Sequence, residues 1–276
     1  MDLLEIENTK NNRHPWELAR ANFVISLIRQ ELTKMSLKKV RILDIGCGDM
    51  FIADCLADSF ENVEIIAVDS NLSKDDIEKF KQINSKKIKV FRTINDFQTE
   101  NEPLPVRRSR SARPSLRCDN KMDFVLILDV FEHINDEQAF LQQLIDKNIF
   151  DNTAVFLITV PSFQSLYCSH DAYLRHFRRY RNSRLVKFFL NNNFIIQDSG
   201  YFFITLLFPR LVRVILEKFG LLKKSNGIGQ WSGNKMMTFI IKNILIVDCM
   251  LMAKLKKIRL KLPGLSNYVI CRKPAS

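Results

Sequence analysis

The stretch Val40–Met50, "VRILDIGCGDM", decides the fold of this chain. A short apolar run ends in Asp44, and Gly46 and Gly48 follow one residue apart. An apolar run of this length bounded by glycine is typical of a buried strand. A residue without a side chain lets a ligand lie against the backbone and allows a turn with positive φ. The stretch therefore predicts a parallel strand with a ligand site at its carboxyl end.

The rest of the chain alternates between apolar runs and amphipathic segments. The predicted strands lie at 39–46, 63–71, 87–93, 122–134, 153–161, 194–203 and 266–273, and the predicted helices at 16–32, 49–60, 73–83, 136–146 and 183–193. Strands that alternate with helices form right-handed crossovers and a doubly wound sheet. We therefore predict an α/β, Rossmann-like fold with a seven-stranded, mostly parallel sheet and a helical insertion before the last strand.

This reading divides the chain into three regions, which are an N-terminal helical cap (1–37), a Rossmann-like core (38–202 plus 264–276) and an apolar, basic helical insertion (203–263). The insertion contains two apolar segments, and neither reaches the roughly 18–20 uncharged residues that a bilayer span needs. They pack as helices against the sheet, or they contact a membrane surface or cover a lipid-like substrate.

Composition limits the partners. The six cysteines include no CxxC pair, and the N-terminus has no basic segment followed by an apolar one. We therefore expect free thiols, no secretory signal and a cytoplasmic protein, with the inner face of a membrane as a further location. The net charge of +12 favours an anionic partner, such as nucleic acid, a membrane or a phosphorylated acceptor. The oligomeric state is left open.

Residues 98–121 are polar and contain three prolines, and five arginines lie between Val106 and Arg117. We predict a loop here, either an insertion or a lid, and assign it no catalytic role.

A second acid narrows the choice of cofactor. Asp69 ends the next predicted strand, where a carboxylate can accept hydrogen bonds from both ribose hydroxyls of a nucleoside. The dinucleotide pattern G-x-G-x-x-G fails because its last position is Phe51, and Asp49 would oppose a pyrophosphate. Asp44 suits a cationic ligand better, and S-adenosylmethionine carries an ammonium and a sulfonium but no phosphate.

Three segments together resemble the motifs of class I S-adenosylmethionine-dependent methyltransferases: "ILDIGCGDM", "AVDSN" and "VLILDVFEHI". The resemblance covers about residues 40–161, and Met50 stands where the family commonly has a third glycine. It implies that Asp44 helps to hold the ammonium and that Asp69, with Ser70, holds the ribose. It also implies that the methionine moiety is lined by Gly46, Cys47 and Gly48, and that Asp129, Val130 and Phe131 lie beside the adenine or the sulfonium.

Two further segments, "RHPWELAR" and "SLYCSHDAYLRHFRRY", resemble those of a bacterial subgroup thought to act on glycans, lipid-linked sugars or other envelope metabolites. All four histidines lie in these segments or in "EHI". The resemblance implies that Trp16 and Arg20 close over the cofactor, with Arg20 near its carboxylate.

Methyl transfer to a hydroxyl requires a positioned acceptor and a base, and histidine suits neutral pH. His170, beside Asp171, is the first candidate and His176 the second. The candidates for contact with the acceptor are His14, His133, Arg178, Arg179 and Tyr180. Alternatively, "RHFRRY" is a structural turn held by ion pairs. We predict no metal site.

The sequence thus predicts a methyltransferase that acts on a small-molecule, saccharide or lipid-linked acceptor, at oxygen. One alternative is an RNA methyltransferase, which the charge favours. No RNA-binding module or N/D-P-P-Y/F motif supports it, so we do not expect nucleic acid as a partner. The other alternative is a non-catalytic scaffold, against which the intact acids and glycines argue.

Overall fold

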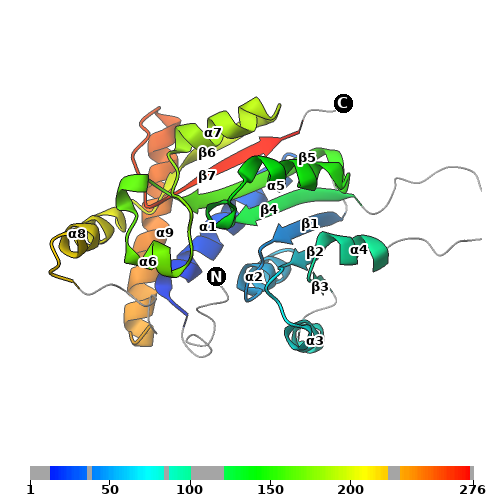
Figure 1. The fold of residues 1–276 in the computed structure, drawn as a ribbon, viewed down its shortest axis with the longest axis horizontal. Coiled ribbons are helices and arrows are strands. Elements are labelled where there is room, and N and C mark those ends of the chain that lie inside the picture. The colour runs from blue at the N-terminus through cyan, green and yellow to red at the C-terminus, as the bar shows by residue number, and fades with distance from the viewer. Residues whose placement is uncertain (1–12, 36–38, 84–86, 101–120, 223–230, 274–276) are drawn as a thin grey trace, which may run out of the picture.

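The computed structural model describes residues 13–35, 39–83, 87–100, 121–222 and 231–273 (Figure 1). Most of the loop predicted at 98–121, including Val106–Arg117, lies outside the described residues. The start of that segment was predicted wrongly, because residues 98–100 belong to helix α4 (Ile94–Glu100).

One seven-stranded sheet forms the centre of the molecule, in the order β3-β2-β1-β4-β5-β7-β6 (Figure 1). Its strands are β1 (Val40–Ile45), β2 (Val63–Val68), β3 (Ile88–Phe91), β4 (Met122–Leu128), β5 (Phe150–Pro161), β6 (Ile195–Phe202) and β7 (Ser266–Arg272). The first five strands are parallel, and β7 runs antiparallel to both β5 and β6. The predicted fold class is confirmed.

Helices cover both faces of the sheet, because successive strand residues point to opposite sides. On β1, Ile42 packs into one apolar cluster and Leu43 into the other. The first cluster takes residues from α1 (Pro15–Leu32), α2 (Phe51–Ser59), α3 (Lys74–Ile83) and α9 (Lys235–Lys257). The second takes residues from α4, α5 (Glu137–Asp146) and α7 (Asn182–Asn191).

Local signals fix where these helices begin. At α1, the His14 side chain accepts from the backbone N–H of Trp16, the Glu17 side chain accepts from the backbone of His14, and Pro15 is the first helical residue. Asp136 caps α5 through the backbone N–H of Ala139. Such caps satisfy N–H groups that the helix itself leaves without a partner.

The insertion forms α8 (Leu207–Lys218) and α9, and α9 packs along α1. In the described part of the chain, one helix, α9, is long enough and apolar enough to cross a membrane, judged by length and composition alone. The prediction concerned an uninterrupted run of uncharged residues, and Lys242 and Asp248 interrupt such a run in α9. The helix is a candidate span because it has 23 residues and a high mean hydropathy in spite of these charges.

Candidate functional site

A cavity of about 900 Å³ opens at the carboxyl ends of the parallel strands. The ends of β1, β2, β4 and β5 form its floor, and residues of α1, α6 (Ser169–Tyr173) and α8 form its walls. The strand order reverses between β1 and β4, and open α/β sheets bind ligands at such a point. The predicted location of the site and this cavity therefore coincide.

Gly46, at the start of the turn after β1, lines the cavity. Gly46 and Gly48 have φ values of +72° and +55°, and a Cβ on Gly46 would lie 2.4 Å from Val130 Cγ2. Met50 also has positive φ, at 69°, as the residue before α2. A side chain in that conformation costs about 1–2 kcal/mol, which explains why a glycine suits this position.

Asp69 joins the ends of the first two strands. Its Oδ2 accepts a hydrogen bond from the Gly48 N–H at 3.0 Å, and its Oδ1 accepts one from the Asn71 N–H at 2.9 Å. Asp69 and Ser70 both line the cavity. Each carboxylate oxygen keeps a second lone pair, so Asp69 can brace the glycine turn and still accept from a ligand hydroxyl.

Asp44 is buried at the end of β1, and its Oδ2 has no hydrogen-bond partner among the described residues. Burial raises the pKa of this carboxyl to about 7. A buried carboxyl without a partner is costly, and a cationic ligand would stabilise its charged form.

Asp129 and Arg20 form an ion pair at the end of β4. Arg20 Nη2 lies 3.0 Å from Asp129 Oδ2, and Thr159 Oγ1 donates to Asp129 Oδ1 at 2.9 Å. Arg20 is buried and lines the cavity with Trp16 and Asp129. Trp16 and Arg20 of α1 therefore lie at the strand ends, where we predicted that they close over the cofactor. Arg20 is, however, already paired with a protein carboxylate.

Four residues with predicted cofactor contacts do not line the cavity, namely Asp44, Cys47, Gly48 and Phe131. Phe131 lies in a 3-10 turn after β4, and its ring packs in the core against Phe140, Phe188 and Phe189 instead of the cavity. Cys47 is also buried in the core, and burial raises the pKa of its thiol well above the usual range. Of the predicted Asp129–Phe131 group, Asp129 and Val130 line the cavity.

Asp171 is the centre of the charged network on the other side of the cavity. Its Oδ1 lies 2.7 Å from Arg179 Nη1 and 3.1 Å from His176 Nδ1. Its Oδ2 accepts from the Cys168 N–H and forms an ion pair with Arg210. Burial alone would raise the pKa of Asp171, but the hydrogen bond from His176 and the two arginines outweigh it and hold this pKa well below its usual range.

This network changes the order of the candidate bases. His170, the sequence neighbour of Asp171, was the first candidate base, but the structure pairs Asp171 with His176. The Nδ1 of His170 has no hydrogen-bond partner in the described part of the chain, and burial lowers the pKa of His170 to about 4. Both histidines line the cavity.

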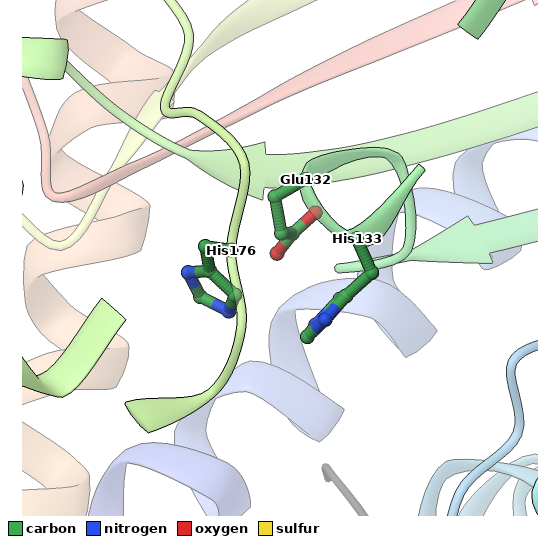
Figure 2. Close-up of side chains that lie close together, drawn as sticks. All are labelled: Glu132, His133 and His176. Carbon is green, nitrogen blue, oxygen red and sulfur yellow. The ribbon is translucent and has the colours of Figure 1, made fainter. Parts of the chain in front are cut away.

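Three side chains converge on one space in the cavity, as Figure 2 shows for Glu132, His133 and His176. Each offers a nitrogen or oxygen atom, and these atoms all lie within 4.8 Å of one another. Glu132 Oε2 is buried without a partner among the described residues, and burial raises the pKa of this carboxyl well above its usual range. Two imidazoles and a carboxyl are groups that exchange protons, and they are also donors that suit a divalent metal.

The remaining predicted acceptor contacts divide into two groups. His14 and Arg179 line the cavity, although Arg179 is also paired with Asp171 and with the carbonyl of Ser162. Arg178 and Tyr180 bond to Glu137 and do not line it. Tyr180 is fully buried and donates to Glu137 Oε1 at 2.6 Å. For these two residues the alternative of a structural turn describes the geometry better.

Among the charged residues that line the cavity, sequence reasoning did not assign four to the site, namely Arg92, Glu132, Arg210 and Arg213. Glu132 stands inside the quoted "EHI", and a carboxylate between a strand end and a histidine was the available signal. Arg210 carried no such signal, because it reaches Asp171 from a helix 39 residues further along the chain.

The model of the methyltransferase-domain family matches residues 18–197. The chain belongs to this family. Its members use S-adenosylmethionine as methyl donor, so the predicted family and cofactor are confirmed.

The family assignment agrees with proteins of similar sequence and structure. The chain is 27% identical over 128 residues to a ubiquinone biosynthesis O-methyltransferase of Rickettsia bellii, which covers 46% of this chain and 45% of that protein. A protein of the same name from Rickettsia conorii is 29% identical over 143 residues, covering 51% of this chain and 42% of that one. The chain thus spans about half the length of the curated relatives it matches.

Solved structures support the fold of this methyltransferase domain. A plantazolicin methyltransferase, BpumL, superposes with a TM-score of 0.50 and 14% identity, covering 94% of this chain and 85% of that one. A sarcosine dimethylglycine methyltransferase from Galdieria sulphuraria gives a TM-score of 0.50 at 13% identity, covering 91% and 86%.

The residues present fit the methyl donor of the family. Gly46 lines the cavity at a position where a Cβ would clash with Val130, and Asp44 is a buried acid whose Oδ2 has no hydrogen-bond partner in the described part of the chain. Asp69 lines the cavity one strand away. A glycine turn that begins between an acid near the end of β1 and an acid after β2 suits a ligand that carries positive charge at one end and ribose hydroxyls at the other.

Proposed function

We propose that this protein transfers a methyl group from S-adenosylmethionine to a hydroxyl oxygen of a small-molecule acceptor. The observation that carries the proposal is the pairing of His176 with the buried Asp171 in the wall of the same cavity that the glycine turn opens into. A hydroxyl must lose its proton when it becomes an ether oxygen, and a histidine oriented by a carboxylate is suited to take that proton.

Each half of the cavity has a task in this proposal. Asp44, Asp69 and the Gly46 turn hold the cofactor, which supplies an electrophilic methyl group when bound. Arg20 and Trp16 of α1 limit the access of water at the strand ends. The acceptor lies toward His133, His170 and His176, where several side chains can orient its hydroxyl.

His176 is our proposed base because its orientation is fixed. Asp171 accepts from Nδ1, which leaves the other ring nitrogen to take the proton from the acceptor. Arg179 and Arg210 keep Asp171 ionised, so the imidazolium that forms is stabilised by a carboxylate. His170 has no such partner among the described residues, and its lowered pKa of about 4 makes it a weaker base.

The names of the Rickettsia relatives support oxygen as the methylated atom. They cover half of this chain at under a third identity, so they support the reaction type more than the acceptor. A saccharide or lipid-linked acceptor remains part of the proposal.

The test has two stages. Calorimetric titration of S-adenosylhomocysteine should show micromolar binding that Asp69→Ala abolishes, while Asp75→Ala, which changes an exposed acid on α3, leaves it intact. Absence of binding to folded protein would favour the scaffold alternative.

The second stage follows a labelled methyl group from S-adenosylmethionine into a panel of phenols, prenylated phenols and lipid-linked sugars. A product that survives alkali and whose methyl group NMR places on oxygen is a methyl ether and supports the proposal, whereas a methyl group on carbon or nitrogen contradicts it. A product that alkali hydrolyses is a methyl ester and contradicts transfer to a hydroxyl.

A further inference from the structure

The helix α8 presents its polar side to the protein and its apolar side to solvent. Arg210 forms an ion pair with Asp171, and Glu217 accepts from the N–H and the hydroxyl of Ser169 at 2.9 and 2.8 Å. The opposite side carries exposed apolar residues at helical spacing, namely Phe208, Leu211, Val212, Ile215 and Phe219. The side chains of Phe208 and Phe219 are 74% and 76% exposed. This polarity is the reverse of that of a helix on the surface of a water-soluble protein.

The helix α9 carries a second exposed apolar stripe. Leu245, Cys249 and Met252 face the core. The outward side has Met236, Ile240, Ile244, Val247 and Leu251, which are 45–72% exposed. Both helices lie at the same end of the longest axis of the molecule (Figure 1). Exposed apolar surface of this extent marks a site of contact with another apolar phase.

The charge of the insertion indicates what kind of apolar partner the two helices contact. Residues 203–263 contain twelve lysines and arginines but two acids. Both acids are used internally, since Glu217 binds Ser169 and Asp248 accepts from the N–H groups of Ile204 and Thr205. Lys218, Lys235, Lys254, Lys257, Arg259 and Lys261 are exposed near the ends of the two apolar stripes. The described part of the insertion therefore presents apolar and positively charged side chains without an exposed carboxylate.

We infer that the outer faces of α8 and α9 dock on an anionic lipid bilayer. Apolar side chains enter the acyl region while lysine and arginine contact the headgroups, as in helices that lie in the plane of the membrane. A second copy of the chain is a poorer occupant, because both surfaces would carry positive charge. RNA is also poorer, because it offers no acyl phase for the two apolar stripes.

The packing of α9 indicates that it lies on the membrane instead of crossing it. The helix is long and apolar enough to span. However, it packs along α1, and its buried Asp248 caps the backbone that leads into α8. Crossing would break these contacts and place a carboxylate in hydrocarbon. The inference does not rest on the proposed reaction.

Flotation of the whole chain with lipid vesicles tests this inference. We expect binding to phosphatidylcholine vesicles that contain about a quarter phosphatidylglycerol, and several-fold weaker binding to pure phosphatidylcholine or at about 0.5 M salt. Phe208→Gln combined with Phe219→Gln should weaken binding at least about tenfold, because two phenyl rings lose their burial in lipid. A second variant, Val247→Gln with Leu251→Gln, tests α9 in the same way.

The matched control is Leu190→Gln with Ile195→Gln, which changes two residues that are 52% and 53% exposed on α7 and β6. It should bind vesicles as the wild type does. Retained binding of S-adenosylhomocysteine shows that each variant is folded. Wild-type protein that does not float with anionic vesicles, or helix variants that bind as well as the control, would overturn the inference. So would a dimer in sedimentation velocity that the Phe208→Gln, Phe219→Gln variant converts to monomer.

Discussion

The cofactor wall and the acceptor wall of the cavity are built in different ways. The cofactor wall consists of residues at the ends of β1, β2 and β4 or directly after them, with Arg20 of α1 paired to Asp129. Hydrogen bonds from backbone N–H groups to strand-end carboxylates brace it, such as the one from the Gly48 N–H to Asp69 Oδ2. The acceptor wall depends on ion pairs between distant segments, such as Asp171 with Arg210 of α8, 39 residues away. A wall made by strand ends is set by the sheet, whereas a wall made by side-chain pairs can be rebuilt by a few substitutions. The first suits a constant cofactor and the second a variable acceptor.

The substitution His176→Ala should distinguish the functions of the two walls most clearly. Loss of a positioned base should lower kcat by about 10²–10⁴-fold. The affinity for S-adenosylhomocysteine should stay within about threefold, because the cofactor wall is untouched. Steady-state kinetics and calorimetry measure the two effects. His170→Ala is the control, and its kcat should fall less than about tenfold.

Two results would contradict this division. Equal losses in both histidine variants would remove the special role of the pair with Asp171. Activity that a chelator abolishes and a divalent metal restores would make Glu132, His133 and His176 metal ligands instead of a proton-transfer group.

On the cofactor wall, Gly46→Ala should weaken binding of S-adenosylhomocysteine at least about tenfold. The new Cβ would lie 2.4 Å from Val130 Cγ2 at a φ of +72°. Val130 is β-branched, so its side chain yields little. Gly220→Ala is a matched control, since Gly220 has a φ of +70° with nothing within 4 Å of the added Cβ. Equal affinities of the two variants would show that the glycine turn does not contact the cofactor.

The buried acid of the cofactor wall predicts a pH dependence. Burial raises the pKa of Asp44 to about 7, and a cationic ligand binds the ionised form. Affinity for S-adenosylhomocysteine should therefore rise with pH, by about tenfold between pH 6 and pH 8. Calorimetry at both values checks this. The rise should vanish in Asp44→Asn, and a rise that persists there would assign the titration to another group.

The smallest effect concerns a residue assigned to neither wall. Tyr180→Phe removes the hydroxyl whose single hydrogen is shared between two acceptors, Glu137 Oε1 at 2.6 Å and the carbonyl oxygen of Phe131 at 3.0 Å. We expect a loss of about 1–3 kcal/mol in the free energy of unfolding, because buried acceptors lose their donor. The KM for the acceptor should not change. A raised KM without a change in stability would return Tyr180 to the acceptor wall.

The sequence determined the sheet and the cofactor wall. Buried parallel strands are recognised as apolar runs in the sequence, and the residues that follow them meet at the carboxyl edge of the sheet regardless of the loop conformations. Asp44, Gly46, Asp69 and Asp129 could therefore be grouped from spacing and resemblance alone. Phe131 was misplaced because a 3-10 turn after β4 rotates its ring into the core.

Tertiary structure decided the rest. Asp171 has His170 as its neighbour in sequence, yet it pairs with His176, because a single helical turn points adjacent side chains in different directions. Arg210, Arg213 and Glu217 share one side of α8 in the sequence pattern. Only packing shows that Arg210 and Glu217 of that side face the protein and that the apolar side faces outward. Periodicity identifies the two sides of a helix, but which side is buried depends on the partners that the fold brings to it.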